Sequence, residues 1–253
     1  MTTSAAEIQL DFITVPPAST PPIGVDLWLL DLSKFTDKSH SEFTTLVAAD
    51  ELARASHFKK NSSHFLATRA LLRAVLAHYT GLGAQALLFA LGEYGKPFLS
   101  NAPAPLHFNL SHCNDLAVLA VSVQGEVGVD IETASARDYL KIAERYFHCA
   151  ELQALHACTI TERERLFYKL WTLKEAFFKA TGGGISSGLN KICFQFDNDT
   201  INVNFNSALN EQGSHWQFEQ QLIAANTWVA LVLHSTESIE HQWLNGNSLL
   251  TGA

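Results

Sequence analysis

The alternation of apolar and polar residues predicts a chain of mixed strands and helices. A buried strand is expected at residues 24–32, followed by short helices within 41–58 and a longer helix over about 62–79. The polar residues 61–63 offer N-caps for the long helix, and Gly81 offers a C-terminal stop. The beginning of the fold is therefore read as one strand followed by helices.

The rest of the chain continues this alternation. Helices are predicted over 136–157 and 161–180, the second stopped by Gly182-Gly183-Gly184, and strands are predicted at 86–91, 106–110, 116–123, 126–132, 191–196, 201–206, 215–223 and 227–234. A helix followed by a strongly apolar strand occurs twice, which indicates two similar halves joined near residues 124–125. Each half would pack one long helix on a small antiparallel sheet, an α+β fold.

Domain boundaries follow from this repeat. Residues 1–22 are polar and end in a proline-rich stretch, so a flexible leader is expected there. The N-terminal half is then 23–124 and the C-terminal half 125–253, with an unremarkable tail after His234.

Composition narrows the class of protein. The 253 residues are 47% apolar and 17% charged, with a net charge of −8, which argues against non-specific binding to nucleic acid or anionic membranes. No apolar stretch approaches the roughly 20 residues that span a bilayer. The four cysteines form no C-x-x-C pair and no zinc spacing, and the chain begins with no secretion signal. A cytoplasmic protein is expected.

One segment departs from this acidic average. Residues 52–92 contain no Asp or Glu, yet they hold five cationic residues: Arg54, Lys59, Lys60, Arg69 and Arg73. Such a segment favours either a local anionic ligand or a helix face whose acidic partners come from elsewhere in the fold. Arg73 in particular is expected as a second phosphate contact or, preferably, as a solvated helix residue.

The segment 126–132 carries two carboxylates in strand alternation. Because side chains alternate along a strand, Gly128, Asp130 and Glu132 share one face, and the Cα atoms of the two acids lie roughly 6–7 Å apart. Glycine leaves room for a ligand beside them, and paired carboxylates repel unless a cation or proton intervenes. This pattern fits a Mg²⁺ site, or else a half-exposed strand whose polar face meets solvent.

A third carboxylate lies on the predicted helix 161–180. An apolar stripe runs along one side of this helix, and Glu175 lies nearly opposite it, with Lys179 one turn further on. Trp171 and Phe178 flank the pair. The arrangement indicates a helix covered on both sides with a polar site on one, or else a simple i,i+4 surface ion pair.

Common phosphate-binding and nucleophile motifs are absent from the sequence. There is no G-x-x-x-x-G-K-[ST] loop and no G-x-S-x-G elbow, and no cysteine stands in a recognisable nucleophile motif. The glycines at 182–184 are better read as a helix stop and turn.

Four segments in order carry a family resemblance: Glu93-Tyr-Gly-Lys-Pro97, Phe108-Asn-Leu-Ser-His112, Val127-Gly-Val-Asp-Ile-Glu132 and Trp171-Thr-Leu-Lys-Glu-Ala-Phe-Phe-Lys179. Over about residues 24–234 the chain resembles the Sfp-type 4′-phosphopantetheinyl transferases. The pairing of G-x-D-x-E with W-x-x-K-E-A-x-x-K is highly specific. The resemblance implies an α+β pseudo-dimer with coenzyme A and Mg²⁺ in the cleft between the halves.

The resemblance also assigns roles to residues. By it, Asp130, Glu132 and Glu175 would hold Mg²⁺ (or Mn²⁺), and Lys179 would contact phosphate. Lys96, Ser111, His112 and Arg69 would grip coenzyme A. The residues upstream of Arg69 match the family pattern poorly, so the 3′-phosphate contact is left open among Arg54, Lys59 and Lys60.

The reaction implied is attack by a carrier-protein serine on the pyrophosphate of coenzyme A. Asp130, Glu175 and Lys179 would form the catalytic set, because a metal and cations stabilise charge on phosphoryl oxygens. Glu175 is the candidate base, directly or through water. The products would be holo-carrier protein and adenosine 3′,5′-bisphosphate. The alternatives are a Mg²⁺-dependent hydrolase of a nucleotide pyrophosphate and a non-catalytic coenzyme A binding module.

The expected partner is an acyl or peptidyl carrier protein. Carrier proteins are usually acidic around their serine, so a docking surface is predicted near Lys174 and the helix at 141–145. Two halves already form the expected cleft, so a monomer is predicted.

Overall fold

The computed structural model describes residues 10–36, 40–58, 60–135, 138–183, 188–198, 200–209 and 211–251. The chain divides into two compact units. The first unit comprises Asp11–Val123 and the chain from Glu240 onward, and the second unit is built on Gln124–Ile239. Each unit has its own hydrophobic core and is described by itself.

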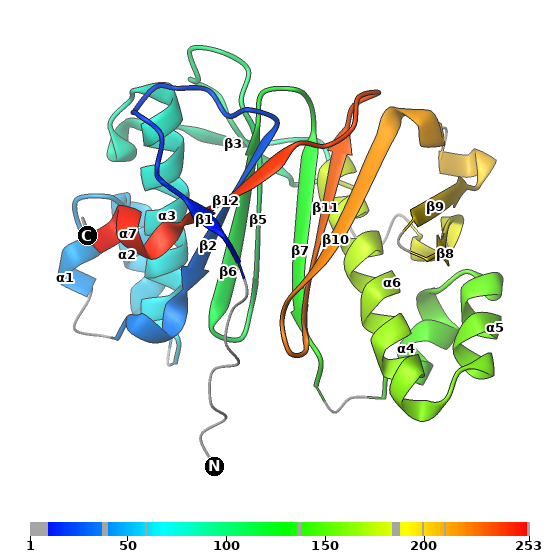
Figure 1. The fold of residues 1–253 in the computed structure, drawn as a ribbon. Helices are drawn as coiled ribbons and strands as arrows, with labels where there is room; N and C mark the ends of the chain where they lie inside the picture. Colours follow the sequence, from blue (N-terminus) through cyan, green and yellow to red (C-terminus); the bar gives the residue numbers. More distant parts are fainter. Residues whose placement is uncertain are drawn as a thin grey trace. The chain divides into compact units, whose positions relative to one another are not determined.

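The first unit packs helices against a five-stranded sheet of order β1-β12-β2-β6-β5 (Figure 1). Strands β2, β6 and β5 are antiparallel neighbours, whereas β12 joins β2 in parallel. The elements are β1 Phe12–Ile13, β2 Val25–Asp31, α1 His40–Phe43, α2 Ala49–Ser56, α3 Ser62–Thr80, β3 Phe89–Leu91, β4 Pro97–Leu99, β5 His107–Cys113, β6 Leu116–Ser122, β12 His241–Asn245 and α7 Gly246–Thr251.

The second unit packs α6 against a three-stranded antiparallel sheet of order β10-β11-β7. A separate hairpin, β8–β9, and the helices α4 and α5 complete the unit (Figure 1). The elements are β7 Val127–Thr133, α4 Tyr139–Tyr146, α5 Cys149–Ala157, α6 Ile160–Thr181, β8 Ile192–Asp197, β9 Thr200–Phe205, β10 Trp216–Ala224 and β11 Thr227–His234.

The two units repeat one topology. In the first, the chain runs β2, α3, the hairpin β3–β4, then β5 and β6, and β6 lies between the other two sheet strands. In the second it runs β7, α6, the hairpin β8–β9, then β10 and β11, and β11 takes the middle place. The expected pair of similar halves, each with one long helix on a small antiparallel sheet, is confirmed.

Glycine ends both long helices, as expected. Gly81 and Gly182 follow α3 and α6 in the left-handed region, with φ of 70° and 80°. This conformation costs little without a Cβ, so glycine is favoured there. Of the expected N-caps, Asn61 does occupy the N-cap position of α3, but its backbone is left-handed and its side chain makes no capping hydrogen bond.

Both long helices are buried on more than one side. In α3 the apolar residues Leu66, Leu71 and Val75 join the core formed with β2 and β6. In α6 the stripe that contains Leu170 and Phe177 packs into the second core. Helical stability here comes from burial of these faces, since an isolated helix of this length is marginal in water.

The structure differs from the expected boundaries at both ends. The expected leader is described only from residue 10, and within it Phe12–Ile13 forms β1 beside Trp243–Leu244 of β12. The segment after Ile239, expected in the C-terminal half, belongs to the first unit, where it supplies β12 and α7. Asn247 fixes this return, because its side chain accepts from Asp31 N at 2.9 Å and donates to Asp31 O at 3.0 Å.

Among the described residues, no helix has both the length and the apolar character needed to cross a bilayer.

Candidate active site

Strand β7 presents its carboxylates to α6. A Cβ added at Gly128 would lie 2.0 Å from Ala176 O and 2.5 Å from Ala180 N, so the helix backbone rests directly on this glycine. Asp130 and Glu132 follow at the alternating positions and share that face. The predicted face is confirmed, and the alternative of a polar face open to solvent is wrong, because α6 covers it.

Helix α6 places matching polar groups along the strand. Lys179 Nζ lies 2.6 Å from Asp130 Oδ1, and Trp171 Nε1 donates to Glu132 Oε1 at 3.3 Å. Glu175 occupies the turn between Trp171 and Lys179 on the same helix face. Four residues singled out in the sequence, two on a strand and two on a helix, therefore meet in one place.

Glu175 lies among more negative than positive charges. Burial, followed by the negative charge of Asp130, raises the pKa of Glu175 to about 7, while Lys179 acts in the opposite direction and Glu132 adds to the rise. Glu175 Oε1 is buried and has no hydrogen-bond partner among the described residues. A buried acceptor without a donor is costly, so this oxygen marks a position suited to a cation or a proton.

The three carboxylates fit a divalent cation in their chemistry. In the described part of the chain, no group of three His, Cys, Asp or Glu side chains converges as a ready metal site. In this structure Lys179 neutralises Asp130, and the Trp171 indole donates to Glu132. The oxygens are nonetheless hard donors, and Glu175 Oε1 lacks a partner, which suits Mg²⁺ or Mn²⁺.

Three predicted ligand residues lie on the hairpin β3–β4 and on β5 of the first unit. Lys96 lies in the hairpin turn, where its carbonyl accepts from Gly92 N at 2.9 Å. Ser111 is buried and His112 is exposed on adjacent positions of β5, so they point to opposite faces of the sheet. His112 shares the face of Phe108, which packs in the core beside α3.

The cationic residues predicted to bind coenzyme A differ in their exposure and in their contacts. Arg54, on α2, is exposed, and its guanidinium lies 5.4 Å from the Phe65 ring centroid. Lys59 lies outside the described residues. Arg69, on α3, is partly exposed, and its Nε lies 2.5 Å from Glu51 Oε1.

The acid-free segment draws its acidic partner from just before it. Glu51 is buried and binds both Arg69 and Arg73, which confirms for these two residues the reading that a neighbouring element supplies the acid. Arg73 is not solvated as preferred, since its side chain is 5% exposed. Sequence reasoning missed Glu51, because the short helices predicted within 41–58 were not given a start, and only the structure shows Glu51 as the third residue of α2, where it accepts from Ala48 N.

The predicted docking surface around Lys174 is wrong. Lys174 has no exposed surface, and its Nζ lies 2.8 Å from Glu151 Oε2. The same nitrogen donates to Leu189 O at 2.8 Å and to Ile192 O at 2.5 Å. Lys174 lies five residues before Lys179 on the helix, so it points to a different side, toward α5 and β8, and it cannot meet a partner protein.

Comparison with known proteins shows which family this sequence belongs to. A family model described as 4′-phosphopantetheinyl transferase superfamily matches residues 126–232, and one described as 4′-phosphopantetheinyl transferase, N-terminal, matches residues 35–124. Their junction coincides with the division between the two units. The chain is also 34% identical over 167 residues to the 4′-phosphopantetheinyl transferase HetI of Nostoc, covering 64% of this chain and 70% of HetI. The chain belongs to the 4′-phosphopantetheinyl transferase superfamily.

Two further relatives, compared by sequence, agree with this membership. The chain is 34% identical to the 4′-phosphopantetheinyl transferase psf-1 of Bacillus pumilus over 64% of this chain and 69% of psf-1. It is 30% identical to the transferase Sfp of Bacillus subtilis over 65% of this chain and 73% of Sfp. A crystal structure of holo-[acyl-carrier-protein] synthase from Thermotoga maritima matches 44% of this chain and 64% of its own, with a TM-score of 0.36 and 21% identity.

Proposed function

We propose that this transferase moves the 4′-phosphopantetheine group of coenzyme A to a serine of an apo acyl or peptidyl carrier protein. The serine oxygen forms a bond to the phosphorus that carries pantetheine, and the pyrophosphate P–O bond breaks. Adenosine 3′,5′-bisphosphate leaves, and the serine proton passes to a base or to water.

One observation carries the proposal. Within residues 126–232, which match the superfamily, Asp130 and Glu132 of β7 meet Glu175 and Lys179 of α6 on a single face. Three acids, one of which has a buried oxygen without a partner, and a lysine support the proposal of a site for a cation and a phosphate here. Such a site stabilises the charge that develops during phosphoryl transfer.

Asp130, Glu132 and Glu175 would hold the divalent cation, Mg²⁺ or Mn²⁺. When bound, that ion would supply charge stabilisation to phosphoryl oxygens. Lys179 would turn from Asp130 toward phosphate, since its side chain is 28% exposed and its ammonium carries three donors. Glu175 remains the candidate base of the prediction.

The first unit would bind the nucleotide part of coenzyme A. Arg54, which is exposed, and Arg69, which is partly exposed, are proposed to contact phosphates together with Lys59, Lys96, Ser111 and His112. Arginine forks and lysine ammonium groups suit this role, because phosphate accepts several charge-assisted hydrogen bonds.

The carrier protein is proposed to dock on α4. Lys141 and Arg145 are exposed there, which suits an acidic partner. The transferase would act as a monomer in the cytoplasm, and its four cysteines, none of which forms a disulfide, agree with a reducing compartment.

Intact-mass spectrometry tests the proposal. An apo acyl carrier protein incubated with this transferase, coenzyme A and Mg²⁺ should gain the mass of one phosphopantetheine. The gain should vanish in the Glu175→Ala variant and with a chelator. Release of phosphopantetheine without a carrier would instead identify a hydrolase, and coenzyme A binding with no turnover would identify a binding module.

A further inference from the structure

A single buried carboxylate organises the cationic face of α3. Glu51, on α2, is 6% exposed. Its Oε1 lies 2.5 Å from Arg69 Nε, and its Oε2 lies 2.5 Å from Arg73 Nε and accepts from Ala48 N at 3.0 Å. One acid therefore caps its own helix and fixes two arginines of the next.

The two arginines are used in different ways. Arg73 is nearly buried, and its Nη1 also donates to Ala84 O at 2.8 Å and Leu87 O at 3.2 Å. Arg69 keeps 25% of its side chain exposed, and no described residue accepts a hydrogen bond from its Nη1 or Nη2. Arg73 thus links α3 to α2 and to the segment that follows α3, whereas both Nη groups of Arg69 remain available to donate to a ligand.

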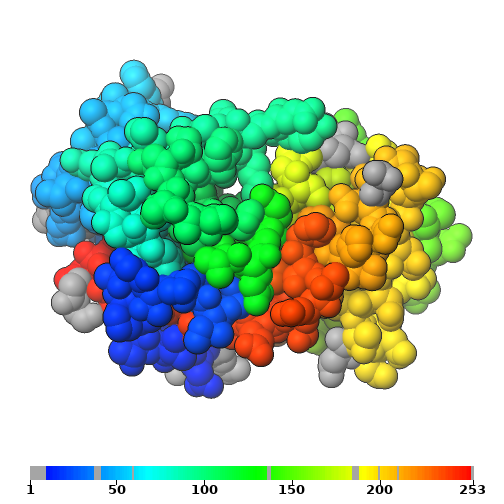
Figure 2. All heavy atoms as spheres, turned by 90° about the horizontal axis from the view of Figure 1, so that it is seen from above, coloured from blue at the N-terminus to red at the C-terminus, as the bar shows by residue number. Residues whose placement is uncertain are grey.

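Arg69 is held on a second side by an aromatic ring. Its guanidinium carbon lies 5.4 Å from the centroid of Phe89, on β3. A guanidinium fixed through Nε and supported by a ring loses little freedom when its two amino groups bind a phosphate fork-on. Residues 60–110, cyan to green in Figure 2, form part of the surface of the first unit in that view.

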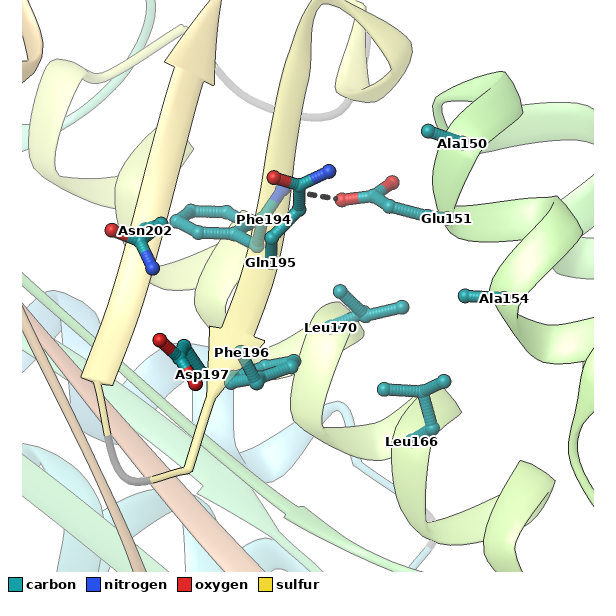
Figure 3. A pocket seen from close by; sticks show the side chains of 10 residues that line it. All are labelled: Ala150, Glu151, Ala154, Leu166, Leu170, Phe194, Gln195, Phe196, Asp197 and Asn202. Atoms are coloured by element: carbon teal, nitrogen blue, oxygen red, sulfur yellow. Dashed lines mark hydrogen bonds between the residues drawn. The ribbon is translucent and has the colours of Figure 1, made fainter.

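The second unit holds its corresponding glutamate with one cation and, among its described residues, has none like Arg69. There Glu151, also the third residue of its helix, binds Lys174 and accepts from Phe194 N at 2.8 Å (Figure 3). Arg69 lies twelve residues before Gly81, the glycine that ends α3. The matching position, twelve residues before Gly182 at the end of α6, is Leu170. Leu170 lines a hollow of about 490 Å³ beside Glu151 and Phe194. In the second unit a single cation, Lys174, therefore pairs with the buried glutamate Glu151.

We propose that Glu51 and Phe89 are positioning residues that orient Arg69 toward a phosphate group of coenzyme A. This rests on the proposed function. Glu51 consumes the Nε donor of Arg69 and leaves Nη1 and Nη2 for bidentate contact. In this proposal Arg73 has a structural role, and Arg69 contacts the phosphate.

A double-mutant cycle in coenzyme A affinity tests this role. Calorimetry would compare wild type, Glu51→Gln, Arg69→Met and the double variant. Glu51→Gln should weaken binding by about tenfold when Arg69 is present and by less than about twofold when it is Met, because the charge-assisted fork is then absent. In transfer assays the KM for coenzyme A should rise more than kcat falls.

Two further variants separate positioning from folding. Arg73→Met removes the neighbouring contact to the same acid, and it should lower stability while leaving coenzyme A affinity per folded molecule unchanged. If Glu51→Gln does not fold, Phe89→Leu replaces it in the cycle. Because Phe89 also lies against Arg73, this variant should lower stability as well, but its loss of coenzyme A affinity per folded molecule should be present only when Arg69 is present.

The outcomes separate this role from the transfer reaction. Equal losses with and without Arg69, in a protein that binds and transfers, would overturn the positioning role alone. Coupling without transfer to any carrier would support it and overturn the proposed reaction. A wild type that binds no coenzyme A would overturn both.

Discussion

Arg73 and Lys174 occupy the same place in the two units. Each lies eight residues before the glycine that ends its long helix, each pairs with the third residue of a preceding short helix, and each donates to carbonyls of the segment that follows. Each also lies over a phenylalanine of the next strand, Phe89 or Phe194. The repeat therefore extends from topology to a buried ion pair that joins three elements.

Loss of the cation from this pair should destabilise the second unit strongly. Lys174→Met would leave Glu151 charged and buried, and breaking a buried pair in this way costs about 3–5 kcal/mol. Urea denaturation measures the loss. Adding Glu151→Gln to Lys174→Met should restore part of it, and Lys141→Met, on the exposed helix α4, is the matched control. A loss within about 0.5 kcal/mol would contradict a structural role.

Gly128 should tolerate no side chain. In Gly128→Ala the new Cβ would meet the backbone of Ala176 and Ala180, so α6 must move off β7. Overpacking of this kind costs about 1–3 kcal/mol, and the displaced Glu175 should reduce transfer further. Thermal unfolding and an activity assay would measure both effects. Gly83→Ala, where the new atom meets nothing closer than 4.0 Å, should change neither.

Glu175 should be essential for activity and dispensable for the fold. Glu175→Gln removes a buried carboxylate from beside two others, so the metal-free protein should keep or gain stability. Transfer should fall by about a hundredfold or more, as when an electrostatic group is removed from an active site. Denaturation without metal and a carrier-loading assay test the two parts. A stability loss as large as that of Lys174→Met would show that Glu175 is structural instead.

His78 should make the first unit less stable in mild acid. Burial lowers the pKa of His78 below its usual 6.5, while Asp26 opposes this, and His78 Nε2 has no hydrogen-bond partner among the described residues. The unfolded chain then takes up the proton first. The contribution of His78 is complete above pH 6.5 and is lost as pH falls through the lower folded value.

Urea titrations between pH 8 and pH 5 would reveal this dependence. The free energy of unfolding should fall more steeply with decreasing pH in wild type than in His78→Gln. Asp26 and Tyr79, which share a hydrogen bond beside His78, are present in both proteins. Parallel curves would contradict the assignment to His78.

The parts of the site that sequence predicted are those set by local periodicity. Alternation along β7 places Gly128, Asp130 and Glu132 together, and helical spacing places Glu175 beside Lys179. Only the packing of α6 on Gly128 was needed to bring the two sets into contact. The two long helices could also be predicted from the sequence, because glycine ends each of them and an apolar face runs along each.

The parts that sequence did not predict depend on distant partners. Lys174 looks like a surface cation on a helix, and only Glu151, on another helix, explains its burial. His241–Asn245 gave no strand signal, because its pairing with β2 involves residues more than 200 positions earlier. Such long-range neighbours leave no trace in local periodicity.

Strand β12 lies between β1 and β2, so the unit begun first is finished last. As the chain leaves the ribosome, the second unit can complete its sheet while β2 still lacks a neighbour on one edge. Residues 124–239 are in effect an insertion within the first unit. A cut near residue 124 would therefore not yield two foldable halves: the early fragment would carry an open strand edge, ready to pair with another chain.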